Sequence, residues 1–406
     1  MDKKNDKVVS LPGLGNVEGI QYAGYASIYG KENPKPEGAK DEELFYWFVG
    51  ASDYEYRPTV IWTNGGPGSS SFWGFFLENG PYEIKGTQDN PKLKPREHAW
   101  NNFANYMIFE HPLSVTLSFQ EQDSDVPENV AQGIDQYYQA LVNFIAKHPE
   151  IAKNPIILAG ESYAGTYLPL LSKAILNGNK REDGTHLNLR ATILMDAWVN
   201  PIVQMSTDTT YAYTHGMISK AQKERLDEKY KYNLANVDQA IKNICGLYMA
   251  NIAELADPPF QPVLDYLNRD DVREAIHAKK GTKLTESWSQ IVSNNYAFGV
   301  NDSYADRVLE LLKENLQIIV VSGLNDAKDC NFLGVEAWLN LLDDPVVNNF
   351  KEAETTHWTS EDSKQVLGYI QNGGILSWVK VLNAGHLAAM DQPKLINLFL
   401  EMCELH

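Results

Sequence analysis

The chain has 406 residues, of which 43% are hydrophobic and 11% aromatic, so it can bury a large core and exceeds one minimal domain. Its net charge of −18 at pH 7 disfavours nucleic acid and anionic membrane surfaces as partners. No apolar run reaches the length of a membrane span, and residues 1–7 lack the apolar core of a signal peptide. The composition therefore predicts a large acidic globular protein, either retained where it is made or separated from a signal segment.

The N-terminal part predicts antiparallel strands in two aromatic-rich runs, residues 20–29 and 44–49. A third strand, residues 59–63, leads directly into the glycine-rich residues 64–71. Such a loop can cradle phosphate, but no lysine follows and the spacing differs from a phosphate loop, so we reject nucleotide binding. Glycines also let backbone N–H groups approach a substrate closely, which makes this segment a candidate oxyanion loop.

A parallel sheet is predicted from the alternation of elements that follows. Residues 105–109 form a short apolar strand, and residues 126–148 place apolar side chains on one face at helical spacing. The strand at residues 155–159 comes next, and residues 191–195 add another. Strand, helix and strand in this order indicate a βαβ unit.

Between residues 201 and 302 the chain becomes rich in Lys, Tyr and Asn, with short helical patterns at residues 219–230 and 271–278. We expect residues 201–302 to form a mostly helical cap over the active site, inserted into a core built from residues 1–200 and 303–406. The core resumes with a helix, two strands and a closing helix, at residues 303–315, 316–321, 375–382 and 393–403.

The organising feature is the stretch Gly160-Glu161-Ser162-Tyr163-Ala164-Gly165, between a predicted strand and a predicted helix at residues 167–176. We interpret it as a nucleophile elbow of the G-x-S-x-G kind, in which small neighbours let a sharp turn expose the Ser162 hydroxyl. The start of the helix offers unpaired N–H groups to a developing oxyanion. Taken alone, the pattern also fits an ordinary strand-to-helix connection.

Two further residues complete a catalytic pattern. Asp326 follows the strand at residues 316–321, and His386 follows the strand at residues 375–382. Taken separately, each residue is better explained by a structural role: Asp326 as a turn aspartate and His386 as a partly buried histidine. Together, the order Ser162, Asp326, His386 at strand ends is the α/β-hydrolase arrangement, in which the histidine takes the serine proton and the aspartate orients the imidazole. The predicted fold is therefore an α/β-hydrolase with a mostly parallel central sheet flanked by helices.

Longer motifs then become informative. They are Leu11-Pro12-Gly13, Leu44-Phe45-Tyr46-Trp47-Phe48, Asn64-Gly65-Gly66-Pro67-Gly68, Gly160 to Gly165, His215-Gly216-Met217-Ile218-Ser219, Ala384-Gly385-His386 and Asp391-Gln392-Pro393. Through these motifs the chain resembles the serine carboxypeptidase family almost from end to end. The resemblance implies an exopeptidase that removes C-terminal residues from peptides.

The resemblance also implies roles for residues that pattern alone leaves unassigned. The backbone N–H groups of Gly66 and Tyr163 would form the oxyanion hole. The terminal carboxylate of the substrate would be held by four residues, Asn64, Gly65, Glu78 and Glu161. Two acids can bind an anion if they share a proton, since two close carboxyls do not both ionise cheaply. Without the resemblance, both glutamates would be taken for exposed or helix-start charges.

The chain departs from the family pattern at several positions. Ser69 stands where the family usually has cysteine, Met195-Asp196-Ala197 replaces Gly-Asn-Gly, and Leu387-Ala388-Ala389 replaces Met-Val-Pro. One additional residue precedes Cys330, which leaves Asp329 as the alternative to Asp326. The three cysteines, Cys245, Cys330 and Cys403, are few and widely spaced, so we expect no disulfide essential for stability and, by resemblance, place Cys330 at the border of the pocket.

The sequence thus predicts a serine-type carboxypeptidase favoured at acidic pH, acting through an acyl-enzyme on Ser162. The alternatives are a carboxypeptidase-like acyltransferase or esterase and a catalytically silent binding protein of the same shape. We expect peptide substrates with a free C-terminus, no metal or other cofactor, and a monomer or homodimer. The resemblance favours a secreted, periplasmic or lysosome- or vacuole-like location, and a cytoplasmic location stays open.

Overall fold

The computed structural model describes residues 6–31, 33–87, 90–182, 184–246, 250–254, 258–280, 284–327, 330–360 and 364–405. All structural statements below concern these residues. Within them, no helix is both long enough and apolar enough to cross a membrane. Asp329, the alternative triad acid, lies outside the described residues.

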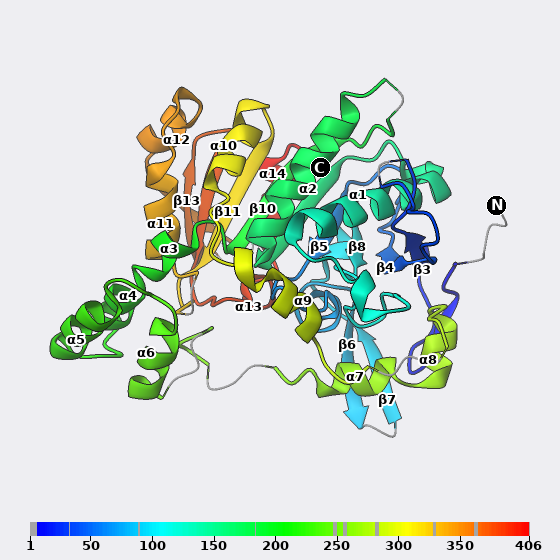
Figure 1. Cartoon of the computed structure of the whole chain (residues 1–406), viewed down its shortest axis with the longest axis horizontal. Helices are drawn as coiled ribbons and strands as arrows, with labels where there is room; N and C mark the ends of the chain where they lie inside the picture. Colours follow the sequence, from blue (N-terminus) through cyan, green and yellow to red (C-terminus); the bar gives the residue numbers. More distant parts are fainter. Residues whose placement is uncertain are drawn as a thin grey trace.

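A ten-stranded mixed sheet forms the centre of the protein (Figure 1). Its strands are, in spatial order, β12 (Thr355–Thr359), β13 (Val366–Asn372), β14 (Leu376–Val381), β11 (Gln317–Gly323), β10 (Leu189–Ala197), β9 (Ile156–Ser162), β5 (Thr59–Thr63), β8 (Asn105–Phe109), β4 (Glu43–Val49) and β3 (Gln21–Ser27). The six strands from β14 to β8 are parallel, and two antiparallel strands flank them on each side. The parallel centre therefore directs the carboxyl ends of six strands to the same edge.

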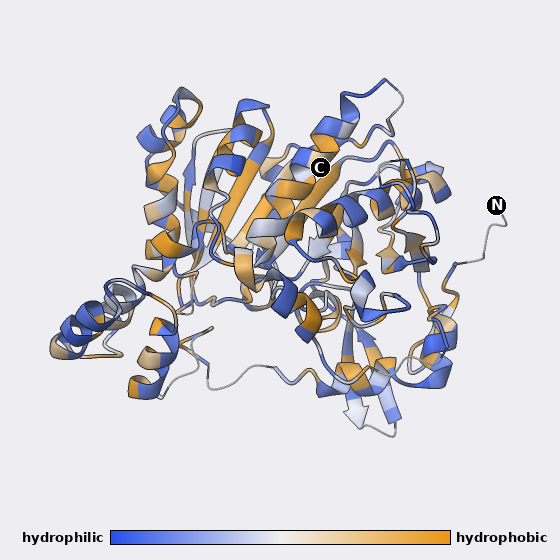
Figure 2. Ribbon diagram, in the orientation of Figure 1, coloured by the Kyte–Doolittle hydropathy of each residue, from blue (hydrophilic) through white to orange (hydrophobic). Residues whose placement is uncertain are grey.

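Both faces of the sheet are buried, and alternate strand residues enter different cores. In β9, Ile156 and Leu158 join one hydrophobic cluster, whereas Ile157 and Ala159 join the other. The first cluster includes α1 (Val130–Lys147), α2 (Ala164–Asn179), α10 (Ala305–Lys313) and α11 (Phe332–Leu341). The second includes the π-helical turn η1 (Gly74–Glu78), α7 (Gln261–Leu267), α13 (Ala388–Asp391) and α14 (Leu395–Met402). Figure 2 shows the resulting apolar strands between amphipathic helices.

Two helices differ in length from the predicted ones for local reasons. Helix α1 begins four residues later than predicted, because the Asn129 side chain caps it by accepting the N–H of Gln132 at 3.1 Å. Helix α2 begins earlier than predicted, immediately after Tyr163, and continues through Pro169. The segment after Ser162 is therefore helical from its first turn.

Seven helices lie between β10 and α10. They are α3 (Pro201–Met205), α4 (Asp208–Thr214), α5 (Lys220–Tyr230), α6 (Val237–Cys245), α7, α8 (Asp270–Ala275) and α9 (Gln290–Tyr296). Five of them form two groups: α4, α5 and α6 pack together at the lower left of Figure 1, and α7 and α8 lie at the lower right beside a small hairpin. Helix α3 packs against α11 instead. The segment 201–302 is thus helical as predicted from its pattern, but it is not one compact unit.

Several elements were not predicted. The hairpin consists of β6 (Tyr82–Thr87) and β7 (Asn90–Pro95), and a shorter pair near the N-terminus consists of β1 (Ser10–Leu11) and β2 (Gly15–Asn16). The edge strand β12, its neighbour β13 and the short helix α12 (Asn348–Glu352) were also missed. Strand β12 is largely exposed and polar, so it lacks the apolar alternation that marks a half-buried strand. Strand β7 consists mostly of Asn, Lys and Pro, residues that are rare in strands, so its composition does not indicate one.

Candidate active site

Ser162 is the last residue of β9 and has the left-handed φ of +59° that a nucleophile elbow requires. The turn depends on close backbone contacts at two glycines. A Cβ on Gly160 would lie 2.3 Å from Thr63 O, and one on Gly165 would lie 2.7 Å from Trp198 N. The position two after Ser162 is Ala164, so the strict G-x-S-x-G pattern does not hold. The second obligatory glycine is Gly165, because it faces the Trp198 backbone.

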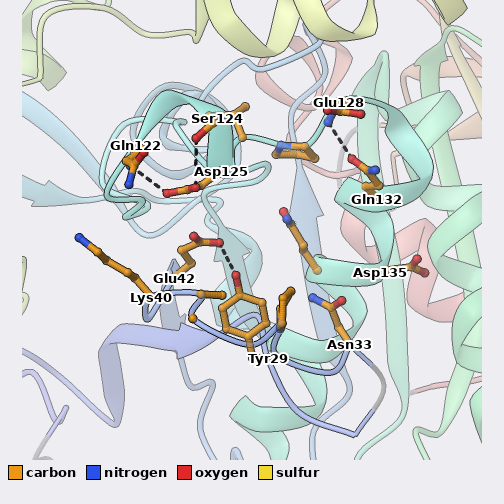
Figure 3. A pocket seen from close by; sticks show the side chains of 16 residues that line it. Tyr29, Asn33, Lys40, Glu42, Gln122, Ser124, Asp125, Glu128, Gln132 and Asp135 are labelled. Carbon is orange, nitrogen blue, oxygen red and sulfur yellow. Dashed lines mark hydrogen bonds between the residues drawn. The ribbon is translucent and has the colours of Figure 1, made fainter.

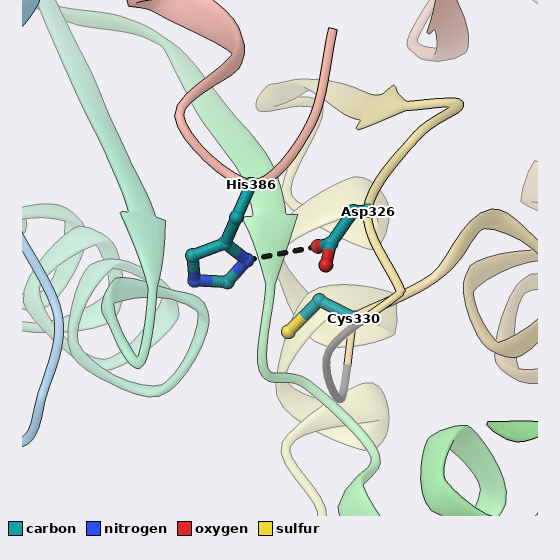
Figure 4. Close-up of side chains that lie close together, drawn as sticks. All are labelled: Asp326, Cys330 and His386. Atoms are coloured by element: carbon teal, nitrogen blue, oxygen red, sulfur yellow. Dashed lines mark hydrogen bonds and ion pairs between the residues drawn. The ribbon is translucent and has the colours of Figure 1, made fainter. Parts of the chain in front are cut away.

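His386 and Asp326 come together from separate loops (Figure 4). The Nδ1 atom of His386 lies 2.8 Å from Oδ2 of Asp326, and the two residues are 6% and 0% exposed. The aspartate carboxylate only accepts, so Nδ1 carries the proton and Nε2 is left as the basic nitrogen. The structure therefore places Asp326 where the predicted register of the loop after β11 put it.

Ser162 and His386 line one pocket of 250 Å³. Its other lining residues are Asn64, Gly65, Gly66, Ser69, Trp73, Glu161, Ser287, Trp288 and Leu387. Segments far apart in the sequence thus meet here, including the loop after β5, the elbow, the loop after β14 and the chain that precedes α9. Ser287 and Trp288 belong to the helical segment and were not predicted, because their sequence surroundings contain no motif.

The glycine-rich loop presses against the residue that follows Ser162. A Cβ on Gly65 would lie 2.3 Å from the backbone N of Tyr163 and 2.9 Å from the Cβ of Ser162. Gly66 has a φ of +109°, which only glycine adopts readily. The backbone N–H groups of Gly66 and Tyr163 therefore belong to adjoining segments beside the serine, as an oxyanion hole requires.

A buried hydrogen-bonded group joins Asn64 to the two predicted glutamates. The Asn64 side chain donates through Nδ2 to Glu78 Oε1 at 2.9 Å and to Glu161 Oε1 at 2.8 Å. Its Oδ1 accepts from the indole of Trp62 and from the backbone of Gly74, which fixes the orientation of the amide. All three members of the group are at most 4% exposed. Glu78, which a sequence reading would place on a helix surface, is in the core because η1 turns it inward.

The carboxyls of Glu78 and Glu161 are buried, and few positive charges act on them. Burial raises the pKa of Glu78, and burial together with the charge of Glu78 raises the pKa of Glu161 well above its usual range. Both carboxyls accept from the same Asn64 amide in a buried site, and two such close carboxyls do not both ionise cheaply, so one of them keeps a proton. The pair therefore holds a proton at a pH at which an exposed glutamate has lost its own.

The loop that carries His386 is fixed on both sides. His386 N donates to Ala250 O at 2.7 Å, and Gly385 N donates to the carboxylate of Asp391 at 2.8 Å. Cys330 points toward the Asp326–His386 pair in Figure 4. Its Sγ atom, a carboxylate oxygen of Asp326 and a ring nitrogen of His386 all lie within 4.8 Å of one another. None of the three cysteines forms a disulfide in the described structure.

A second pocket of 520 Å³ lies beside α1 (Figure 3). Its lining is polar, and Glu42 accepts a hydrogen bond from the Tyr29 hydroxyl at 2.7 Å. None of the described residues that line it is a predicted site residue. This pocket is larger than the one that Ser162 and His386 line, but it is not the candidate active site.

The sequence model described as serine carboxypeptidase matches residues 12–257 and 247–402. The chain belongs to the serine carboxypeptidase family.

Relatives in this family include serine carboxypeptidase 3 from Hordeum vulgare, with 28% identity over 96% of this chain and 79% of that protein. Serine carboxypeptidase-like 48 from Arabidopsis thaliana is 29% identical over 95% of this chain and 79% of that protein. The crystal structure of KEX1(delta)p, a prohormone-processing carboxypeptidase from Saccharomyces cerevisiae, superimposes with a TM-score of 0.85 at 21% identity, covering 99% of this chain and 96% of that one.

These comparisons confirm the predicted family, the α/β-hydrolase fold and the class of enzyme. The protein is a serine-type carboxypeptidase, and its substrates are peptides. The roles of the individual site residues stay predictions, and they are developed below.

Proposed function

We propose that the protein removes C-terminal residues from peptides through an acyl-enzyme on Ser162, with His386 and Asp326 completing the triad. The observation that carries this proposal is the buried Asn64–Glu78–Glu161 group, because Asn64 and Glu161 line the same pocket as Ser162 and His386. A generic esterase has no use for a proton-sharing carboxyl pair beside its nucleophile. An enzyme that recognises a terminal carboxylate has such a use.

In the acylation step, His386 Nε2 takes the proton of Ser162 Oγ while Oγ attacks the carbonyl carbon of the last peptide bond. The negative charge that develops on the carbonyl oxygen is met by the N–H groups of Gly66 and Tyr163. His386 then gives its proton to the leaving amine, which departs as the free C-terminal residue. Water, deprotonated by the same imidazole, hydrolyses the acyl-enzyme and restores Ser162.

Recognition of the terminal carboxylate requires neutral donors in the pocket. The protonated member of the Glu78–Glu161 pair and the backbone N–H of Gly65 provide them, and Asn64, whose Nδ2 donates to both glutamates, holds the pair beside the pocket. Loss of the shared proton would set two negative charges against the carboxylate of the substrate. Peptide hydrolysis is therefore favoured on the acidic side.

We further propose that residues 201–302 act as a cap, since Ser287 and Trp288 from this segment line the pocket. The free C-terminus of the peptide then enters between this segment and the sheet edge. A monomer or homodimer, and a secreted, periplasmic or lysosome- or vacuole-like location, complete the proposal.

The test is mass spectrometry of a peptide ladder incubated with the protein at several pH values. Sequential loss of C-terminal residues supports the proposal, and a C-terminally amidated ladder is the matched control. Release of no amino acid, combined with acyl transfer from a glucose ester to an alcohol, would identify an acyltransferase. Failure of a fluorophosphonate probe to label Ser162 would instead identify a catalytically silent protein.

A further inference from the structure

Asp196 is a fully buried acid at the carboxyl end of β10, next to the strand that ends at Ser162. Its φ of +38° lies in the left-handed region, which a non-glycine residue adopts only when its surroundings enforce it. The position was noted in the sequence only as a departure from a family motif. Its contacts indicate that it takes part in building the site.

Asp196 connects the loops that carry the three proposed triad residues. Its Oδ1 accepts the N–H of Gly323 at 2.7 Å, and Gly323 O accepts the N–H of Asp326 at 3.1 Å. A Cβ on Gly323 would lie 2.1 Å from Gly385 O, directly before His386. Two residues after Asp196, Trp198 N donates to Ser162 O at 2.8 Å. The backbone around Asp196 thus contacts the nucleophile on one side, and its side chain holds the acid and base loops on the other.

We propose that Asp196 is a positioning residue and that it is protonated and neutral in the folded protein. It holds Gly323 in place, and through Gly323 it positions Asp326 and His386 without adding a charge beside them. This inference rests on the proposed triad. In the protonated form Oδ1 remains a carbonyl-type acceptor for the Gly323 N–H. The hydrogen bond therefore persists while the negative charge stays on Asp326 alone, where it orients His386.

The surroundings of Asp196 disfavour its ionised form. Its Oδ2 has no hydrogen-bond partner among the described residues. The titratable groups that act on it come from four elements and are all acids: Asp326 after β11, Asp391 on α13, Glu161 on β9 and Tyr211 on α4. Burial, and then the charge of Asp326, raise the pKa of Asp196 well above its usual range. An ionised Asp196 would be a buried charge without a counter-ion.

The catalytic part of the test compares Asp196→Asn with Asp196→Ala, using an ester substrate that has no terminal carboxylate. Asparagine keeps the acceptor oxygen and cannot ionise, so kcat should stay within about threefold of the unmodified protein. Alanine removes the acceptor and leaves the Gly323 N–H unpaired, so kcat should fall at least about tenfold with little change in KM. Retention of kcat by Asp196→Ala, or its loss in Asp196→Asn, would overturn the positioning role.

The proton itself is tested by equilibrium unfolding of the unmodified protein and Asp196→Asn between pH 5 and pH 8. If the folded protein holds a proton that the unfolded chain has released, the unfolding constant of the unmodified protein should rise relative to that of the variant by up to about tenfold per pH unit. Other titrating groups cancel in this ratio because both proteins carry them. A ratio that does not change with pH would overturn the protonated form. This measurement needs no turnover, so it also applies if Asp196→Ala fails to fold or the proposed triad is wrong.

Discussion

Replacement of Glu78 and Glu161 by glutamine, singly and together, tests how the enzyme recognises a terminal carboxylate. Glutamine keeps an amide donor in place of the carboxyl proton and does not titrate. In the unmodified protein, loss of the shared proton removes a charge-assisted hydrogen bond worth about 1.5–3 kcal/mol, which corresponds to a rise in peptide KM of about 10-fold to 150-fold. Each single variant should reduce this alkaline rise, and the double variant should abolish it.

The assay is the pH dependence of KM for one peptide and for its C-terminal amide, measured with the four proteins. The amide lacks the carboxylate, so its KM should depend little on the charge of the pair in any of them. We expect kcat and KM to respond separately, because the chemical step depends on His386 as the base, whereas binding of the carboxylate depends on the glutamate pair. The same pH dependence of KM for peptide and amide in the unmodified protein would refute the shared proton.

Unfolding provides a second readout of the same pair. The pKa values of Glu78 and Glu161 are both raised in the folded state. The folded protein therefore holds a proton that the unfolded chain loses near the usual glutamate pKa of about 4.3. The stabilisation is fully present below that pH and is lost as the pH rises through the folded pKa, by up to about 1.4 kcal/mol per pH unit. The double glutamine variant should lack this decline, and an unchanged pH dependence would argue against the raised pKa values.

Three further predictions follow from the geometry. Ser162→Ala and His386→Ala should each lower kcat by at least about 10⁴-fold with an unchanged circular dichroism spectrum. Asp326→Asn should lower kcat by about 10³-fold to 10⁴-fold. If Asp329→Asn lost activity and Asp326→Asn did not, Asp329 would be the triad acid. Gly65→Ala should lower kcat by about 10²-fold or more, because the new Cβ would lie 2.3 Å from Tyr163 N, and full activity would contradict the placement of the oxyanion loop. Reducing agent should leave the melting temperature unchanged, since none of the three cysteines forms a disulfide in the described structure. A thiol reagent should inhibit the unmodified protein but not Cys330→Ala.

Much of the fold could be predicted from hydrophobic patterns and from the order of the elements along the chain. Apolar runs with the right spacing located most strands of the parallel sheet, and the short turns after them held Ser162, Asp326 and His386. These residues were predictable because carboxyl ends of parallel strands converge on one edge of the sheet, so position in the sequence implies position in space. The edge strand β12 was missed because it is largely exposed and polar, and its neighbour β13 was missed because Gly368 interrupts its short apolar pattern. The segment 201–302 contains the helices α3 to α9, and which of them pack together depends on contacts that the local pattern does not encode.

The sequence by itself determined the fold class, the family and the order of the candidate triad, because local periodicity and short motifs encode strands, turns and an elbow. Only the tertiary structure showed that Asn64 bridges Glu78 and Glu161, two acids 83 positions apart in the numbering, and that Asp196 is buried in the core, where only its Oδ1 has a hydrogen-bond partner among the described residues. Burial decides whether a carboxyl is an ordinary surface charge or a retained proton, since the free energy of ionisation depends on the surrounding dielectric and charges. Those surroundings come from residues that are distant in the chain, and they exist only once the chain has folded.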